Sequence, residues 1–395
     1  MTGSFGNADR EGERLAWVAL GLLVEPGNRD LGILVRQVGV VEALHRLLAG
    51  KATKQLVTAT ATRRGAADPY ETAERALAEA DRLGVRLVTP VDEEYPPQLE
   101  DLVTISEDVA DPVRRNTFPP HCLWVRGGPA LVEACEQSVA IVGSRASTSY
   151  GEHVGRDFAF GLAERGWTVV SGGAFGIDNA AHRGALAASG RTIAVLACGI
   201  DRPYPQSHAG LFDVIARTGL VVSEWPPGAD PHRHRFLIRN RVIAAATVGT
   251  VMIEANARSG ARFTLNRARR LNRLFLAVPG PITSAASVGC HEAVRDGATL
   301  VATVPHIIDA VGRLGDDLAP AARATPRARD SLTPLQARVL DGVRPRKPLT
   351  AAEIAAAVGV SARDARRVLP ALTLAGFVVQ VGGTYRLARS PSHEP

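Results

Sequence analysis

The sequence predicts an α/β fold built on a doubly wound parallel sheet, with short helices before the sheet and a small domain after it. Three observations carry this prediction. Several apolar segments between residues 138 and 278 are continuous rather than alternating, which is typical of strands buried on both faces. Helical patterns separate these segments, as a parallel sheet requires. Residues 331–388 then follow the order helix, turn, helix, hairpin.

Length and composition support a folded chain of several domains. At about 100 to 200 residues per domain, 395 residues predict two or three domains. The hydrophobic share of 46% and the charged share of 22% are close to those of folded globular proteins. Forty-six Lys and Arg against 40 Asp and Glu give a formal net charge of +6, which permits a polyanionic partner without requiring one.

The chain offers no pattern for a metal, a disulfide framework or a membrane. Its four cysteines are scattered without ligand spacing, so we expect buried thiols and no metal site. The apolar runs 15–24 and 242–253 are shorter than the roughly 20 residues of a membrane span. The N-terminus does not resemble a signal peptide, and we expect a cytoplasmic protein with no membrane partner.

We expect four parts along the chain: a helical module over 1–80, the α/β domain over 81–313, a linker rich in Ala, Pro and Arg over 314–330, and a last domain over 331–388. In the first part, apolar residues recur at helical spacing over 15–23 and 41–48. The glycine-broken stretch 31–40 fits a helix-hairpin-helix or sterile-alpha-motif-like unit that touches DNA backbone, and it equally fits a plain packing unit.

In the α/β domain, strand-like segments at 85–88 and 123–125 precede the main sheet. The strands of that sheet are expected at 138–143, 168–171, 192–197, 220–223, 250–254 and 274–278, with helices at 152–164, 177–188 and 211–217. In the last domain, Thr350 and Ser361 are capping residues for two helices, and Gly382-Gly383 is a hairpin turn. This order predicts a winged helix.

Two glycine-containing motifs follow strands, where an open α/β sheet binds its ligands. The first is Gly143-Ser144-Arg145, which combines an open backbone, a hydroxyl donor and a planar cation. The second is Gly172-Gly173, which leads into a helix, so its backbone amides can hold an anion. The sequence has neither a GxGxxG after the first strand nor a GxxxxGK[ST], which disfavours a dinucleotide and excludes a P-loop, and we expect no cofactor.

Several titratable residues near these motifs have two interpretations. Asp178 and His182 are four residues apart on one helical face, which suits acid/base chemistry but also a simple pairing near the helix N-terminus. His232 and His234 lack a third ligand at metal spacing, so we interpret them as loop residues. Glu254 closes a strand and is interpreted as structural, although an enzyme of this architecture would place a carboxylate there.

The most informative stretch is basic and contains an aromatic residue. It holds Arg233, Arg235, Phe236, Arg239 and Arg241 just before an apolar helical segment. Cations that follow phosphates, together with a ring that stacks on a base, are typical of single-strand binders. The stretch therefore predicts a nucleic-acid site.

Ordered motifs across residues 90–300 together resemble the DNA-processing protein A family, also called DprA or Smf. The matching pieces are Tyr95-Pro96, Val142-Gly143-Ser144-Arg145, Ser149-Tyr150-Gly151, Ser171-Gly172-Gly173-Ala174, Gly176-Ile177-Asp178, Ala181-His182, Gly199, Asp201, Tyr204-Pro205, His208, Ser223-Glu224, Pro227-Gly228, Pro231, Phe236, Arg239-Asn240-Arg241, Glu254, Ser259-Gly260 and Val278-Pro279-Gly280. The chain departs from the family pattern at Leu237, where a proline is usual, and in the basic stretch 261–272, which would widen the DNA track or alter partner surfaces.

The resemblance implies an extended Rossmann-type domain that binds and protects single-stranded DNA and loads the recombinase RecA during natural transformation. It implies a homodimer, no catalytic activity, and variable N-terminal and winged-helix attachments. Carried over by position, the DNA site comprises Gly143, Ser144, Arg145, Gly172, Gly173, Arg233, Phe236, Arg239 and Arg241.

Two alternatives stay open at this point. The first is a nucleotide-processing enzyme on a related fold, with Glu254 or Asp178 in catalysis. The second is a regulator that reads duplex DNA through Arg363, Arg366 and Arg367 on the second helix of the winged helix.

Overall fold

The computed structural model describes residues 7–65, 67–105, 116–257, 259–312, 328–345 and 347–388. The chain divides into two compact units, Met1–Ala319 and Pro320–Pro395. Residues 314–327 of the predicted linker lie outside the described residues. The boundaries of the four parts expected from the sequence stay predictions.

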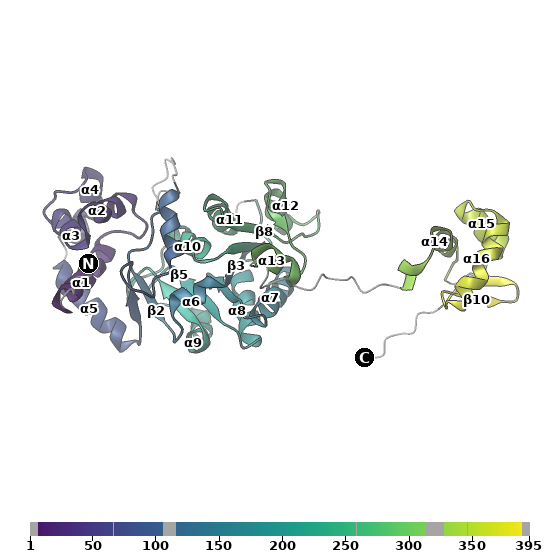
Figure 1. Cartoon of the computed structure of the whole chain (residues 1–395), viewed down its shortest axis with the longest axis horizontal. Helices are drawn as coiled ribbons and strands as arrows, with labels where there is room; N and C mark the ends of the chain where they lie inside the picture. The colour runs from purple at the N-terminus through teal and green to yellow at the C-terminus, as the bar shows by residue number, and fades with distance from the viewer. Residues whose placement is uncertain are drawn as a thin grey trace, which may run out of the picture. The chain divides into compact units, whose positions relative to one another are not determined.

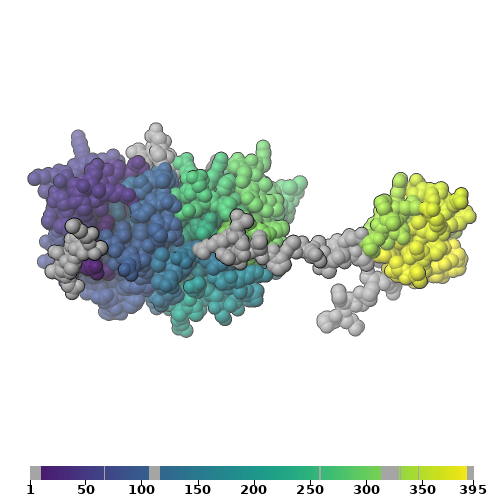
Figure 2. Space-filling model, viewed as in Figure 1, coloured from purple at the N-terminus to yellow at the C-terminus, as the bar shows by residue number. Residues whose placement is uncertain are grey.

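The first unit begins with helices that pack on the edge of a sheet (Figure 1). They are α1 (Asn7–Leu23), α2 (Arg29–Val38), α3 (Val40–Leu48), α4 (Lys54–Arg64) and α5 (Pro69–Arg82). Asn28, Thr53 and Asp68 cap three of them by accepting backbone N–H groups of the first turn. Their apolar faces share one hydrophobic core with Trp124 and Leu196 of the sheet. Figure 2 shows these helices, in purple, in continuous contact with the following segments of the unit.

The sheet of the first unit has nine strands, most of them parallel. Its strands are β1 (Arg86–Val88), β2 (Leu123–Arg126), β3 (Ser138–Gly143), β4 (Thr168–Ser171), β5 (Thr192–Leu196), β6 (Leu220–Ser223), β7 (Gly249–Ile253), β8 (Leu274–Ala277) and β9 (Thr299–Leu300). Their order is β1-β2-β6-β5-β4-β3-β7-β8-β9, and only the pairs β1·β2 and β2·β6 are antiparallel. From β3 the chain adds β4, β5 and β6 on one side of the sheet, and it then returns to add β7, β8 and β9 on the other side of β3. The sheet is therefore doubly wound, as predicted. The short edge strand β9 was not expected from the sequence.

Helices cover both faces of this sheet, as the continuous apolar strands require. They are the 3₁₀ segment η1 (Pro97–Thr104), α6 (Leu131–Glu136), α7 (Ser149–Ala163), α8 (Ile177–Ala187), η2 (Gln206–His208), α9 (Ala209–Thr218), α10 (Arg233–Ala246), α11 (Gly260–Arg270), η3 (Ala285–Ser287), α12 (Val288–Arg295) and α13 (Val304–Val311). Alternate side chains of β3 show the two layers. Ala140 and Val142 pack with α10 and α11, whereas Val139 and Ile141 pack with α7, α8 and α13. The switch in winding direction lies between β3 and β7, where such sheets open a ligand-binding crevice.

The second unit is a winged helix, as predicted. It consists of η4 (Ala328–Ser331), α14 (Pro334–Asp341), α15 (Ala351–Val358), α16 (Ala362–Leu374), β10 (Val378–Val381) and β11 (Thr384–Leu387). Thr350 and Ser361 cap α15 and α16. Gly382 and Gly383 both have positive φ, which the tight turn between β10 and β11 requires. Within the part of the chain that the structure describes, no helix of either unit is long and apolar enough to cross a membrane.

Candidate nucleic-acid interface

A groove of about 890 Å³ lies beyond the carboxyl ends of β3 and β7, at the point where the sheet changes direction. Most of its lining comes from three segments: residues 142–146 at the end of β3 and in the turn after it, the N-terminal half of α10, and the segment 256–264 that leads from β7 into α11. Ala174, Asp178, Tyr204 and Pro231 also contribute to the lining. The groove holds six of the nine expected site residues: Gly143, Ser144, Arg145, Arg233, Phe236 and Arg239.

One part of the groove combines a cation with two aromatic rings in an edge-to-face arrangement. The guanidinium carbon of Arg145 lies 5.0 Å from the centre of the Phe236 ring. The ring of Tyr204 meets Phe236 edge-on, with their centres 5.5 Å apart. Arg145 is exposed and Tyr204 retains 49% of its surface. This arrangement offers an aromatic face for a base beside a positive charge for a phosphate.

Two of the groove's arginines are free to meet an anion. Arg145 and Arg233 are both exposed, and neither forms an ion pair with any acid of the described residues. Other exposed arginines of the first unit do form ion pairs; Arg126, for example, lies 2.8 Å from Asp213. The unpaired arginines thus make the groove a local site of positive charge.

Arg239 supplies a third charge, which is fixed at the floor of the groove. Its side chain is buried, and its Nη1 donates to the carbonyl oxygens of Gly172, at 2.6 Å, and Val195. Burial lowers the pKa of Arg239 to about 10, so the guanidinium stays protonated at neutral pH. A Cβ on Gly172 would overlap this guanidinium, which explains why the position needs glycine.

Gly172 and Gly173 lie behind the groove rather than in its lining. The carbonyl oxygen of Gly173 accepts a hydrogen bond from His208 Nδ1 at 3.0 Å, and a Cβ on Gly173 would meet the Phe212 ring. The next amide, of Ala174, donates to the Asp178 carboxylate at 3.3 Å. The double glycine therefore makes room for protein side chains, in contrast to the expected anion nest.

Arg241 is the largest departure from the expected site. It is fully buried and forms a bidentate pair with Glu224, with both N–O distances 2.6 Å. Its Nε donates to the carbonyl oxygen of Phe118 at 2.9 Å. Residues two apart on a helix face different directions, so Arg239 and Arg241 cannot both face the groove. Arg241 instead ties α10 to the end of β6.

The carboxylates considered for catalysis are engaged within the fold. Glu254 is 5% exposed, and its carboxylate accepts the backbone N–H and the hydroxyl of Thr148, which fixes the turn before α7. Asp178 lines the groove, and burial raises its pKa. His182 does not pair with Asp178 as expected, because its Nδ1 meets the Thr192 hydroxyl at 2.8 Å.

Histidines of the basic stretch and the extra arginines of α11 have their own contacts. The rings of His232 and His234 stack with centres 5.7 Å apart, and the described residues contain no cluster of three or more metal-ligating side chains. In α11, Arg262 lies 2.5 Å from Glu292, Arg269 lies over the Phe275 ring, and Arg267 is buried.

The sequence predicted only part of the opposite wall of the groove, as the basic stretch 261–272 that would widen the DNA track or alter partner surfaces. This wall is formed by Asn256, Ser259, Phe263 and Thr264, which follow β7. These residues could have been assigned to the groove from their position after the carboxyl end of β7, which lies next to β3, because neighbouring parallel strands end at one edge of the sheet.

In the second unit, Arg363, Arg366 and Arg367 are all exposed on α16. The alternative in which these arginines read duplex DNA stays open.

Comparison with known proteins decides the family. The model of the family described as DNA recombination-mediator protein A matches residues 86–312, and the model of the DprA winged helix domain matches residues 323–384. The chain belongs to the DprA family. This membership supports a role in DNA processing and recombination mediation, and it does not favour the nucleotide-processing enzyme.

Relatives match the chain over most of its length. The putative DNA processing protein DprA of Mycobacterium tuberculosis strain H37Rv is 42% identical, over 95% of this chain and 94% of its own length. Protein Smf of Escherichia coli K12 is 33% identical, over 82% and 83%. The solved structure of DprA from Streptococcus pneumoniae has a TM-score of 0.62 at 28% identity, over 76% of this chain and 98% of that chain.

Proposed function

We propose that this DprA-family chain binds single-stranded DNA in the groove between β3 and β7. The observation that carries the proposal is the joint presence there of two unpaired exposed arginines, Arg145 and Arg233, and an aromatic face formed by Phe236 and Tyr204. Single-strand binders combine cations for the backbone with rings for the bases. Arg239 adds a fixed positive charge at the floor of the groove.

We also propose, from its membership of the DprA family, that the chain acts without catalysis, as a cytoplasmic homodimer. In this role it would protect single-stranded DNA and load RecA during natural transformation or recombination. Support for the lack of catalysis comes from Glu254, whose carboxylate is engaged by Thr148. A panel of nucleotides and oligonucleotides should yield no free base or phosphate on incubation with the protein. RecA filament assembly on bound strands tests the loading, and light scattering tests the dimer.

The groove itself is tested by fluorescence anisotropy with a labelled single strand and the variants Phe236→Ala and Arg145→Ala. Loss of the stacking ring in Phe236→Ala should weaken binding about 5- to 150-fold, since stacking contributes about 1–3 kcal/mol per base. Loss of Arg145 should make the plot of log K against log salt less steep. Its negative slope should shrink in magnitude by about 0.7, the value for one phosphate contact on a single strand.

The matched control is Arg75→Ala. Arg75 is an exposed arginine on α5 whose hydrogen bonds stay within its own helix. Arg75→Ala removes the same positive charge as Arg145→Ala but outside the groove, so its affinity for the single strand should stay within about twofold of the wild-type value. Equal affinities for the wild type, both groove variants and the control would refute the proposed site.

A further inference from the structure

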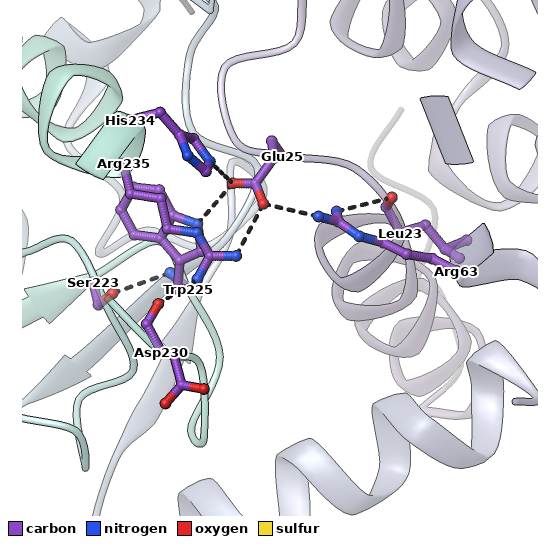
Figure 3. A network of polar contacts seen from close by, with 8 residues as sticks. All are labelled: Leu23, Glu25, Arg63, Ser223, Trp225, Asp230, His234 and Arg235. Atoms are coloured by element: carbon purple, nitrogen blue, oxygen red, sulfur yellow. Dashed lines mark hydrogen bonds and ion pairs between the residues drawn. The ribbon is translucent and has the colours of Figure 1, made fainter. Parts of the chain in front are cut away.

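Glu25 connects the N-terminal helices to the start of the proposed DNA-binding helix α10 (Figure 3). It lies just after α1, and its carboxylate accepts hydrogen bonds from Arg235 at 2.9 Å, from the Trp225 indole N–H at 3.0 Å, and from Arg63 of α4 at 2.9 Å. His234 Nε2 lies 3.9 Å from the same carboxylate. One carboxylate therefore joins α4, the segment after β6, and the first turn of α10.

The first turn of α10 needs an acid from elsewhere. It begins Arg233-His234-Arg235, contains no acidic residue, and its N-cap residue His232 makes no side-chain capping bond. Positive charge at a helix N-terminus opposes the helix dipole, which favours carboxylates there. Glu25, from a segment 210 residues away, supplies the missing negative charge.

The Arg235 side chain is held from several sides. Its exposed fraction is 11%, its Nη1 donates to the carbonyl oxygen of Asp230 at 2.9 Å, and its guanidinium carbon lies 5.4 Å from the centre of the Trp225 ring. Glu25 is the acid that forms an ion pair with Arg235 among the described residues. Hydrogen bonds from Arg235 and Trp225 outweigh the effect of burial on Glu25, so its pKa lies below the ordinary value and it is ionised at neutral pH.

The contacts of Glu25 lead directly to the groove. Arg235 precedes Phe236 in the chain and lies two residues from Arg233, and both of these line the groove. Trp225, the second partner of Glu25, packs in one small apolar cluster with Ile238 and Phe236. Fixing Arg235 and Trp225 therefore fixes the rotation of the first turn of α10 and the placement of the Phe236 ring.

We propose that Glu25 is a positioning residue for single-stranded DNA binding, through which the N-terminal helices hold the first turn of α10 in the conformation that presents Arg233 and Phe236 to the strand. The inference rests on the proposed function of the groove. It assigns the N-terminal helices a role in DNA affinity without a DNA contact of their own.

The test exploits the sign of the effect. Glu25→Gln removes a negative charge near the groove, so long-range electrostatics alone would tighten DNA binding. Loss of the positioning contacts should instead weaken binding about tenfold, which corresponds to about 1.4 kcal/mol. Affinity is measured by anisotropy with a labelled single strand, at a temperature well below the unfolding of every variant.

The matched control is Glu42→Gln on α3. Glu42 is an exposed acid that pairs with Arg46 of its own helix, at 2.7 Å, so its removal changes the charge of the same part of the chain equally. The affinity of this variant should stay the same or rise slightly. Glu25→Asp retains the carboxylate and should recover part of the affinity lost in Glu25→Gln, a rescue that general destabilisation would not produce.

The outcomes separate this inference from the proposed function. Weaker binding by Glu25→Gln, partial recovery by Glu25→Asp and no loss with Glu42→Gln would support the positioning role. Unchanged or tighter binding by Glu25→Gln, while Phe236→Ala binds weakly, would overturn the positioning role and leave the groove in place. Unchanged binding by Phe236→Ala would refute the groove and this inference with it. If Glu25→Gln does not fold, wild-type affinity in Glu25→Asp together with wild-type affinity in Arg235→Gln would overturn the positioning role.

Discussion

Replacing Glu224 with Gln should destabilise the first unit strongly, because it leaves the Arg241 guanidinium buried without its acid. The side chain of Arg241 is 0% exposed and that of Glu224 is 2% exposed. Breaking a buried pair by removing one partner costs about 3–5 kcal/mol, since the remaining charge is uncompensated. The remaining acceptors near Arg241 are neutral backbone carbonyls, those of Phe118 and Ile238.

This cost converts into a shift of the unfolding temperature. The first unit spans Met1–Ala319. At about 2.1 cal/mol/K per residue its unfolding entropy is roughly 0.67 kcal/mol/K, so a loss of 3–5 kcal/mol lowers Tm by about 4–8 °C. The chain has four tryptophans, Trp17, Trp124, Trp167 and Trp225, and all belong to this unit. Intrinsic tryptophan fluorescence during heating therefore reports this unit alone.

The control for this experiment is an exposed pair of the same chemistry. Glu79 and Arg82 of α5 lie 2.5 Å apart with side chains 40% and 70% exposed. Because exposed ion pairs contribute little to stability, Glu79→Gln should lower Tm by no more than about 1.5 °C. A Tm for Glu224→Gln equal to that of Glu79→Gln would refute the structural role of the Arg241 pair.

Two further predictions concern the floor of the groove and the buried histidine behind it. Gly172→Ala should displace the Arg239 guanidinium from the Gly172 carbonyl and weaken single-strand binding roughly tenfold, or about 1.4 kcal/mol. Fluorescence anisotropy with a labelled single strand measures this loss. The control is Gly210→Ala, which should bind normally because its added Cβ meets no atom within 4 Å. Burial lowers the pKa of His182 from 6.5 to about 3, so the unfolded chain binds this proton first and stability falls as pH drops below 6.5. The loss is about 1.4 kcal/mol per pH unit, or about 2 kcal/mol between pH 6.5 and 5. Tm measured over this range should fall less steeply in His182→Gln, and parallel curves for both proteins would contradict the assignment.

The sequence could predict the sheet because its strands carry their own information. Continuous apolar segments indicate burial on both faces, and alternate residues of β3 do pack into cores on opposite faces. The winged helix was predictable because capping residues and a Gly-Gly turn mark its boundaries locally, at Thr350, Ser361 and Gly382. The location of the groove followed from the rule that parallel strands end at one edge.

The functions of individual glycines and arginines depended on partners distant in the chain. Position 172 requires glycine because an arginine from α10 occupies the space that a Cβ would take. The sequence alone does not show whether a glycine makes room for a side chain of the protein or for a ligand. Arg241 differs from Arg239 only in its direction on the helix and in the presence of Glu224 at the end of β6. Glu25 is 210 residues from Arg235, and its local sequence contains no motif that indicates the contact.

The measurement that tests the central proposal most directly compares the affinity for a labelled single strand with that for the matched duplex across a salt series, with free nucleotide as competitor. Contacts from Arg145, Arg233 and Arg239 to three phosphates predict a slope of log K against log salt of about −2 for the single strand. The groove proposal predicts a clear preference for the single strand that micromolar nucleotide does not affect. Weak single-strand binding that micromolar nucleotide displaces would contradict it and would indicate that the groove holds a small anionic ligand instead.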